Sequence, residues 1–170
     1  MLRFLRLQNW KSYYEPVEFT MLATREQKHG HTLARIGRAR VLPVSAIYGA
    51  NAAGKSVLIE VLSTLKRLVI ETRGRGETIP VEPHLLKGGD QPTTFALEFT
   101  AAEVGDSSAE TTYFYELVLD ARHVVSEALF RVTARADVPL FERKDSSIEL
   151  SDALSGNDLI ATLARSVPSN

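Results

Sequence analysis

Gly49-Ala50-Asn51-Ala52-Ala53-Gly54-Lys55-Ser56 is the stretch that decides the fold of this 170-residue chain. It follows an apolar, β-branched run, 41–48, which we predict to be a buried strand with a tolerated proline near its start. From Lys55 the apolar residues recur at intervals of three and four, which predicts an amphipathic helix ending near Arg73. A glycine-rich loop between a buried strand and a helix is the setting in which this pattern forms a Walker A phosphate-binding loop.

The positions of the loop have separate roles in holding a nucleotide. Gly49 and Gly54 permit backbone angles and a close approach that a Cβ would block, so successive N–H groups can point at phosphate oxygens. The N-terminus of the following helix adds its partial positive charge. We expect Lys55, the only catalytic candidate, to reach the β- and γ-phosphates, and the Ser56 hydroxyl to bind Mg²⁺. The predicted cofactors are ATP and Mg²⁺, and the predicted nucleotide-binding residues of the loop are Gly49, Ala50, Asn51, Ala52, Ala53, Gly54, Lys55, Ser56 and Val57.

Alternating apolar residues predict strands on both sides of the loop. Residues 2–8 and 17–21 are predicted strands, and the turn between them, 9–13, is expected to present a lysine and two aromatic side chains. Residues 23–40 are basic and predict a solvated connecting loop, with a loop that contacts nucleotide or nucleic acid as the alternative. Alternation resumes over residues 93–150, which predicts an antiparallel meander.

Hydrolysis needs acidic residues as well as the loop, one to hold Mg²⁺ through water and one to orient the attacking water. Asp120 ends an apolar run, but it lies inside the predicted meander, and we interpret it as a turn residue. Glu60, one turn into the helix, is interpreted as a solvated helix residue. The sequence therefore predicts nucleotide binding and identifies no acid for hydrolysis.

The composition indicates the class of protein but does not indicate what the protein binds. The chain is 44% hydrophobic and 24% charged, which is typical of a globular domain with one core. Its net charge of -1 gives no overall electrostatic reason to bind nucleic acid. It has no cysteine and no long uninterrupted apolar run, so we expect a cytoplasmic protein without membrane contact. His29 and His31 flank a glycine and are interpreted as loop residues, not metal ligands.

Four stretches together resemble the N-terminal part of bacterial ABC-type ATPases in the broad RecF, SMC and OLD-like class of AAA family ATPases. They are more narrowly similar to the ATPase subunits of anti-phage systems such as Septu, PARIS and RloA-like systems. The stretches are Asn9-Trp10-Lys11-Ser12-Tyr13, the loop with its preceding Ile47-Tyr48, Tyr113-Phe114-Tyr115 with Glu127-Ala128-Leu129, and Leu140-Phe141-Glu142-Arg143. The resemblance spans nearly the whole chain. Ala53 stands where the family has Ser or Gly, a small-for-small change that should leave phosphate binding intact.

The residues and the resemblance together predict an α/β fold. The chain would be the N-terminal lobe of an ABC-type P-loop ATPase head, with a mixed β-sheet around the P-loop helix and an antiparallel β-meander. It would form a single domain over residues 1–170. Nucleotide-binding strands and the P-loop helix would occupy 1–77, an antiparallel β subdomain 78–150, and the start of a further helical region 151–170.

The resemblance also implies partners and further site residues. Lys11 and Ser12 would lie near the nucleotide, and Asn51 would face the γ-phosphate side. The signature loop, Walker B acids and switch histidine would follow residue 170, so the C-terminal half of the head is expected to be absent. Family heads close around ATP as homodimers or higher homo-oligomers, so this chain alone should bind nucleotide weakly and not turn it over. The implied partner is an effector, a nuclease or toxin, with nucleic acid contacted through missing regions.

Three other functions stay open at this point. A DNA repair or recombination ATPase of the RecF or SMC type would share the fold. A small P-loop kinase suits the length of the chain, but such kinases usually begin at the loop and continue as alternating strands and helices. A non-catalytic binding module could retain the loop as a glycine-rich turn.

Overall fold

The computed structural model describes residues 1–24, 29–37, 39–71, 77–89, 91–103, 106–145 and 147–155. Its elements, in chain order, are β1 Leu2–Gln8, β2 Val17–Thr20, a 3-10 turn Gly30–Thr32, β3 Ala34–Ile36, β4 Ala39–Val41, α1 Lys55–Ile70, β5 Thr93–Glu103, β6 Asp106–Leu119, β7 Val124–Val132, β8 Val138–Lys144, β9 Ser147–Leu150 and α2 Asp152–Ser155.

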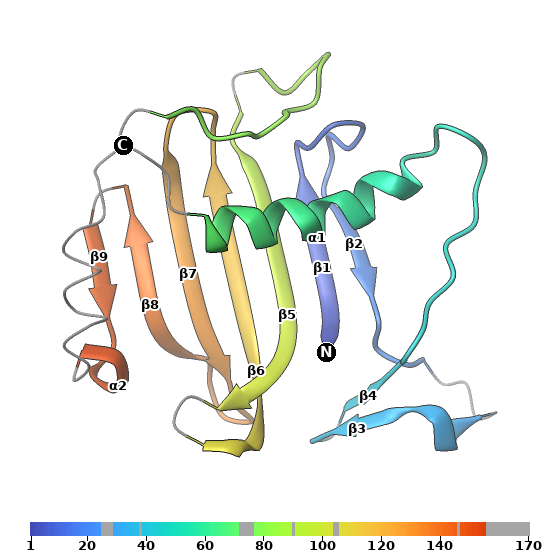
Figure 1. Cartoon of the computed structure of the whole chain (residues 1–170), viewed down its shortest axis with the longest axis vertical. Coiled ribbons are helices and arrows are strands. Elements are labelled where there is room, and N and C mark those ends of the chain that lie inside the picture. The colour runs from blue at the N-terminus through green and yellow to red at the C-terminus, as the bar shows by residue number, and fades with distance from the viewer. Residues whose placement is uncertain are drawn as a thin grey trace.

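One large sheet organises the fold. Its seven strands run in the order β2-β1-β5-β6-β7-β8-β9, and each neighbouring pair is antiparallel. The strands β5 to β9 follow one another as a meander, which confirms the prediction for residues 93–150. Strand β1 pairs with β5 and places Leu5 opposite Leu97. The helix α1 crosses one face of this sheet, while β3 and β4 form a separate hairpin (Figure 1).

The core lies where α1 covers the sheet. Leu58, Val61 and Leu65 of α1 are buried in one cluster with Leu5 of β1 and Phe95 of β5. Their spacing of three and four along the helix puts them on one face, as the sequence predicted. Burying a side chain of this size contributes about 1.5–3 kcal/mol to the free energy of folding. The helix is therefore held by the burial of this face against the sheet, in a cluster that also includes Leu117 and Leu119 of β6.

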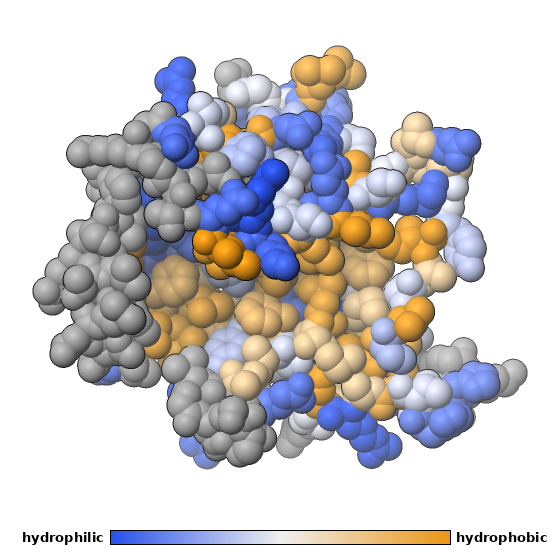
Figure 2. All heavy atoms as spheres, viewed as in Figure 1, coloured by the Kyte–Doolittle hydropathy of each residue, from blue (hydrophilic) through white to orange (hydrophobic). Residues whose placement is uncertain are grey.

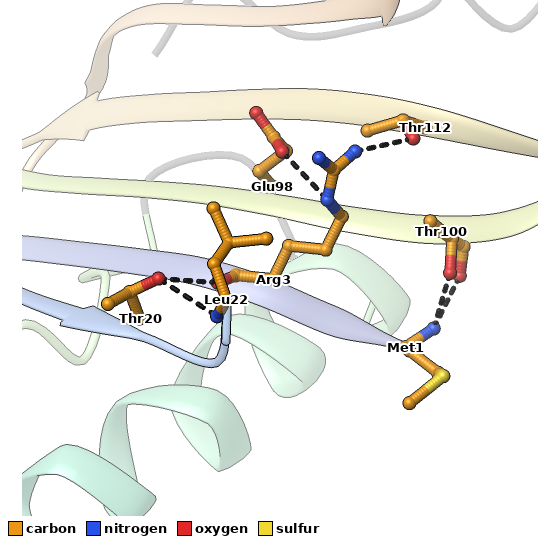
Figure 3. Close-up of polar contacts among 7 residues, drawn as sticks. All are labelled: Met1, Arg3, Thr20, Leu22, Glu98, Thr100 and Thr112. Atoms are coloured by element: carbon orange, nitrogen blue, oxygen red, sulfur yellow. Dashed lines mark hydrogen bonds and ion pairs between the residues drawn. The ribbon is translucent and has the colours of Figure 1, made fainter. Parts of the chain in front are cut away.

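Polar contacts hold β1 against the meander at the end away from the loop. The amino group of Met1 donates to the carbonyl and hydroxyl oxygens of Thr100 at 2.7 and 2.9 Å (Figure 3). The Arg3 guanidinium lies 3.1 Å from the Glu98 carboxylate and donates to the Thr112 hydroxyl at 2.8 Å. These contacts join β1 to β5 and β6, so the register between them is specified by both polar and apolar side chains.

The predicted strand before the loop is wrong. Strand β4 ends at Val41, and the segment 42–54 runs outside the sheet to α1 (Figure 1). Pro43 has no N–H to donate, and the ladder with β3 ends at Val41. Val44 and Tyr48 are 76% and 90% exposed instead of buried. The predicted mixed sheet is also wrong for the described residues, because this segment does not join the antiparallel strands.

The basic region 23–40 contains more regular structure than predicted. The hairpin of β3 and β4 occupies much of it, and Leu22 forms an isolated bridge with Val41. Residues 25–28 and 38 lie outside the described residues. The strands β1 and β2 share a sheet with the meander, so the proposed segments 1–77 and 78–150 meet within one layer.

An apolar groove of about 530 Å³ lies between the C-terminal half of α1 and the meander. Its lining includes Val69 and Ile70 from α1 and Phe99, Leu129 and Phe141 from the strands. Hydrophobic side chains gather on this face of the molecule, beside α1 (Figure 2).

Candidate functional site

The phosphate-binding loop is an exposed turn that leads directly into α1. Gly54 is the N-cap of the helix and has a φ of 81°, and Ala52 has a φ of 62°, so both lie in the left-handed region. The N–H of Ala53 donates to the carbonyl of Ala50 at 3.3 Å, and that of Val57 donates to Gly54 at 3.0 Å. The first amides of a helix have no partners within the helix, so this turn presents free donors to an anion.

Lys55 folds back over the loop. Its Nζ donates to the carbonyl oxygens of Gly49 at 2.9 Å and Ala50 at 2.6 Å. The two carbonyl oxygens thus accept the N–H donors of the Lys55 ammonium, which the sequence analysis expects to bind phosphate oxygens. A nucleotide phosphate would replace neutral acceptors by charged ones, which form stronger hydrogen bonds with an ammonium group.

The turn 9–13 lies against the last glycine of the loop. The Tyr13 hydroxyl donates to the carbonyl of Gly54 at 3.2 Å. A Cβ added to Gly54 would lie 2.8 Å from the Tyr13 hydroxyl and 3.0 Å from Ser12 Oγ. Gly54 therefore needs to be glycine for its backbone angle and for this close approach. A Cβ on Gly49 would meet only ordinary contacts, the nearest at 3.6 Å, so the expected steric need for glycine applies to Gly54 alone in this conformation.

Gly54→Ala should lower the free energy of unfolding by about 1–2 kcal/mol, because the left-handed backbone is costly for a residue with a Cβ. The added methyl group would also push the turn 9–13 away from the loop. Urea unfolding measures the effect, and Gly89→Ala is the matched control because nothing lies within 4 Å of a Cβ there. Equal unfolding midpoints for the two variants would contradict the strain at Gly54.

The turn 9–13 is built around two buried residues. Trp10 is only 1% exposed, and its ring packs edge-on against Phe95 with centroids 5.3 Å apart. The expectation that both aromatics of the turn are presented is therefore wrong for Trp10, because it faces the core between β1 and β5. Asn9 is fully buried with a left-handed φ of 52°, a conformation that asparagine tolerates better than most residues.

The side chain of Asn9 connects this turn to the segment before β5. Its Nδ2 donates to the carbonyls of Gly88 at 3.0 Å and Gln91 at 2.7 Å, and its Oδ1 accepts from the N–H of His84 at 3.0 Å. A Cβ on Gly88 would lie 1.8 Å from Asn9 Oδ1, so the segment can approach only because residue 88 is glycine. Asn9 thus specifies the position of the turn from which Lys11, Ser12 and Tyr13 reach the loop.

Lys11 lies between two carboxylates from distant parts of the chain. Its Nζ is hydrogen-bonded to Glu60 of α1 and lies 3.3 Å from Glu82. The hydrogen bond to Glu60 raises the pKa of Lys11 above its usual value, although partial burial acts in the opposite direction. Glu60 is an exposed helix residue, as interpreted from the sequence, with 47% of its side chain exposed, but it also forms an ion pair that the sequence did not predict. The sequence carried no signal for these pairs, because their partners are 49 and 71 positions apart.

Asp120 acts as a turn residue, as predicted. Its Oδ1 accepts from the N–H groups of Arg122 at 2.7 Å and His123 at 2.9 Å, and its Oδ2 lies 3.1 Å from the His123 ring. Burial raises the pKa of Asp120, but the two backbone hydrogen bonds and the neighbouring charges lower it by more, so the net pKa is depressed. These contacts occupy the carboxylate within the β6–β7 connection.

The described residues contain no group of three or more His, Asp or Glu side chains suited to hold a metal ion. The rings of His29 and His31 have centroids 6.2 Å apart. None of the described helices is long and apolar enough to cross a membrane. Within this part of the chain, the polar groups that converge around the α1 N-terminus form the strongest candidate site.

A comparison with protein families gives an independent reading of this site. The family described as AAA domain, putative AbiEii toxin, Type IV TA system matches residues 44–156, which cover the loop, α1 and the meander. No curated protein and no solved structure matches the chain. The matched range is well over half of the sequence. The chain therefore belongs to this AAA domain family, a family of P-loop ATPases that bind ATP.

Proposed function

We propose that this chain binds Mg²⁺-ATP as the N-terminal lobe of an ATPase head, and that nucleotide-driven dimerisation of heads controls a partner effector. The observation that carries the proposal is the loop itself, where Lys55 already places its ammonium group on the carbonyls of Gly49 and Ala50 at the start of α1. ATP supplies phosphate oxygens that this ammonium and the free amides of the turn can bind.

We assign the effector to the class of nucleases or toxins that act in anti-phage defence. The description of the matching family, which names a putative toxin and a toxin–antitoxin system, supports a toxin-related role. The chain alone is proposed to bind ATP without turning it over. Asp120, an acid that follows an apolar strand, is engaged in its own turn by the N–H groups of Arg122 and His123.

Titration calorimetry with Mg²⁺-ATP tests the binding, and sedimentation of the chain with and without nucleotide tests the dimerisation. The proposal expects saturable binding, and an increase in mass on adding Mg²⁺-ATP to a preparation that contains the complete head. Absence of binding by the chain would leave the loop as a structural turn and would overturn the proposal. Binding without any change in mass for the complete head would overturn the dimerisation step alone.

Ser56→Ala tests the assigned Mg²⁺ ligand. Ser56 is exposed in the first turn of α1, so its hydroxyl is accessible to a metal bound with the phosphates. We expect the variant to lose roughly tenfold in affinity for Mg²⁺-ATP, equivalent to about 1.4 kcal/mol, and to match the wild type when Mg²⁺ is chelated. Ser63→Ala, on an exposed position of the same helix, is the control. An equal loss with and without Mg²⁺ would argue against Ser56 as the ligand.

A further inference from the structure

The position of Lys11 places a second cation beside the loop. Its backbone N–H donates to the carbonyl of Glu82 at 2.8 Å. Its neighbour Tyr13 donates to the carbonyl of Gly54, and Ser12 Oγ lies 3.0 Å from where a Cβ on Gly54 would be. Trp10 and Tyr13 exchange two backbone hydrogen bonds of 2.8 Å, which close the turn on either side of Lys11. The backbone at Lys11 is therefore fixed next to the N-terminus of α1, and only its side chain is free to move.

In this structure that side chain is directed to acidic partners. Its Nζ bonds to Glu60 and lies near Glu82, and it also lies 5.5 Å from the centre of the Trp10 ring. Only 21% of the Lys11 side chain is exposed, whereas Glu60 and Glu82 are 47% and 67% exposed. The Lys11 side chain is thus more covered than the two carboxylates that it contacts, which water still reaches.

We propose that Glu60 and Glu82 are positioning residues that hold Lys11 on their carboxylates when no nucleotide is bound, and that ATP phosphates draw Lys11 off them. This inference rests on the proposed function, because it adds a regulated contact to the same ATP site. The exchange moves the ammonium from two partly exposed carboxylates to the phosphates, and leaves Glu60 and Glu82 to solvent.

Three physical arguments support the exchange. Partly exposed ion pairs are weak, typically worth well under a tenfold change in an equilibrium. Phosphate groups offer several charged acceptors in the same place, which an ammonium binds as a point charge. The flexible four-carbon stem of lysine lets the ammonium move without a change in the backbone. The loop and turn can therefore stay in place while Lys11 changes partner.

The two carboxylates should consequently weaken ATP binding. Neutralising either one removes a competitor for Lys11, so we expect Glu60→Gln and Glu82→Gln each to raise the affinity for Mg²⁺-ATP by about twofold to fivefold. Lys11→Met should lower the affinity by a similar factor. In the Lys11→Met background, Glu60→Gln should have no further effect, because there is no cation left to release.

Titration calorimetry on these variants at one ionic strength tests the inference, with thermal unfolding to show that each variant is folded. Glu142→Gln, an exposed change of the same charge on β8 across the sheet, is the matched control and should bind like the wild type. Unchanged or weaker binding by both carboxylate variants, with wild-type binding intact, would overturn the exchange and leave the proposed function standing. An equal gain from Glu60→Gln in the Lys11→Met background would also overturn it, because the effect would then be a general one of charge. Absence of binding by the wild type would overturn both proposals.

Discussion

Lys55→Ala is expected to lower the affinity for Mg²⁺-ATP by at least about a hundredfold, equivalent to about 2.7 kcal/mol. Lys55 is the residue of the loop that carries a full charge, and its hydrogen bonds to phosphate oxygens would be charge-assisted at both ends. The ammonium already lies over the loop, within hydrogen-bond distance of Gly49 and Ala50, so binding requires only a local change of acceptor. Removing it leaves the loop itself with uncharged donors only, the backbone amides and the Ser56 hydroxyl.

Calorimetry on Lys55→Ala and on Lys66→Ala separates this local effect from a change in net charge. Lys66 lies on the same helix, exposed and near the apolar groove, where it cannot reach the start of α1. We expect Lys66→Ala to bind within about twofold of the wild type, as for an exposed charge distant from the ligand. Similar affinities for all three proteins would contradict the assignment of Lys55 to the phosphates.

Asn9→Ala is expected to lower the free energy of unfolding by about 3–4 kcal/mol. The substitution leaves two carbonyls and one N–H without their partner, and an unsatisfied buried polar group costs about 1–3 kcal/mol. It also puts alanine at a φ of 52°, a left-handed backbone angle that alanine, without a side-chain amide to bond locally, adopts at a greater cost than asparagine. Such a loss is a large fraction of the stability of an ordinary domain, so part of the population would unfold near physiological temperature.

Urea unfolding measured by fluorescence of the single tryptophan, Trp10, reports on this change directly, because its ring is buried beside the turn. Gln8→Ala is the matched control, because it removes the same amide group from the adjacent, partly exposed position. It should change the free energy of unfolding by no more than about 0.5 kcal/mol. A loss of the same size in both variants would show that the Asn9 hydrogen bonds contribute little.

The helix and most of the strands could be predicted because their signals are local. The periodicity from Val57 to Leu68 reflects the core-facing side of α1, and the alternation in residues 93–150 reflects strands with one face on the core. The expected burial of Leu62 and Val69 is wrong, because they are 37% and 63% exposed beside the apolar groove. Strand β1 was predicted from alternation over residues 2–8 and occupies Leu2–Gln8. In each case the burial pattern follows from the repeat of the element itself, without knowledge of what covers it.

The segment before the loop shows where this reasoning ends. Residues 41–48 have the composition of a buried strand, but a strand also needs a neighbour to accept its hydrogen bonds. Strand β4 ends at Val41, and Leu42 still donates its N–H to the carbonyl of Met21 at 2.8 Å. Pro43 has no N–H to donate, and residues 43–48 have no pairing among the described strands. Composition describes what a segment can bury, whereas pairing is a property of the arrangement around it.

By itself the sequence determined a loop that can bind phosphate, the helix behind it and the antiparallel meander. The spacing of glycines, lysine and apolar residues specifies these features locally, from residues that are close together in the sequence. Only the tertiary structure decided that Asn9 connects the turn to Gly88, that Trp10 is buried, and that Lys11 meets Glu60. Those contacts join residues far apart in the chain, and they depend on how β1, α1 and the segment before β5 pack together, which no local periodicity encodes.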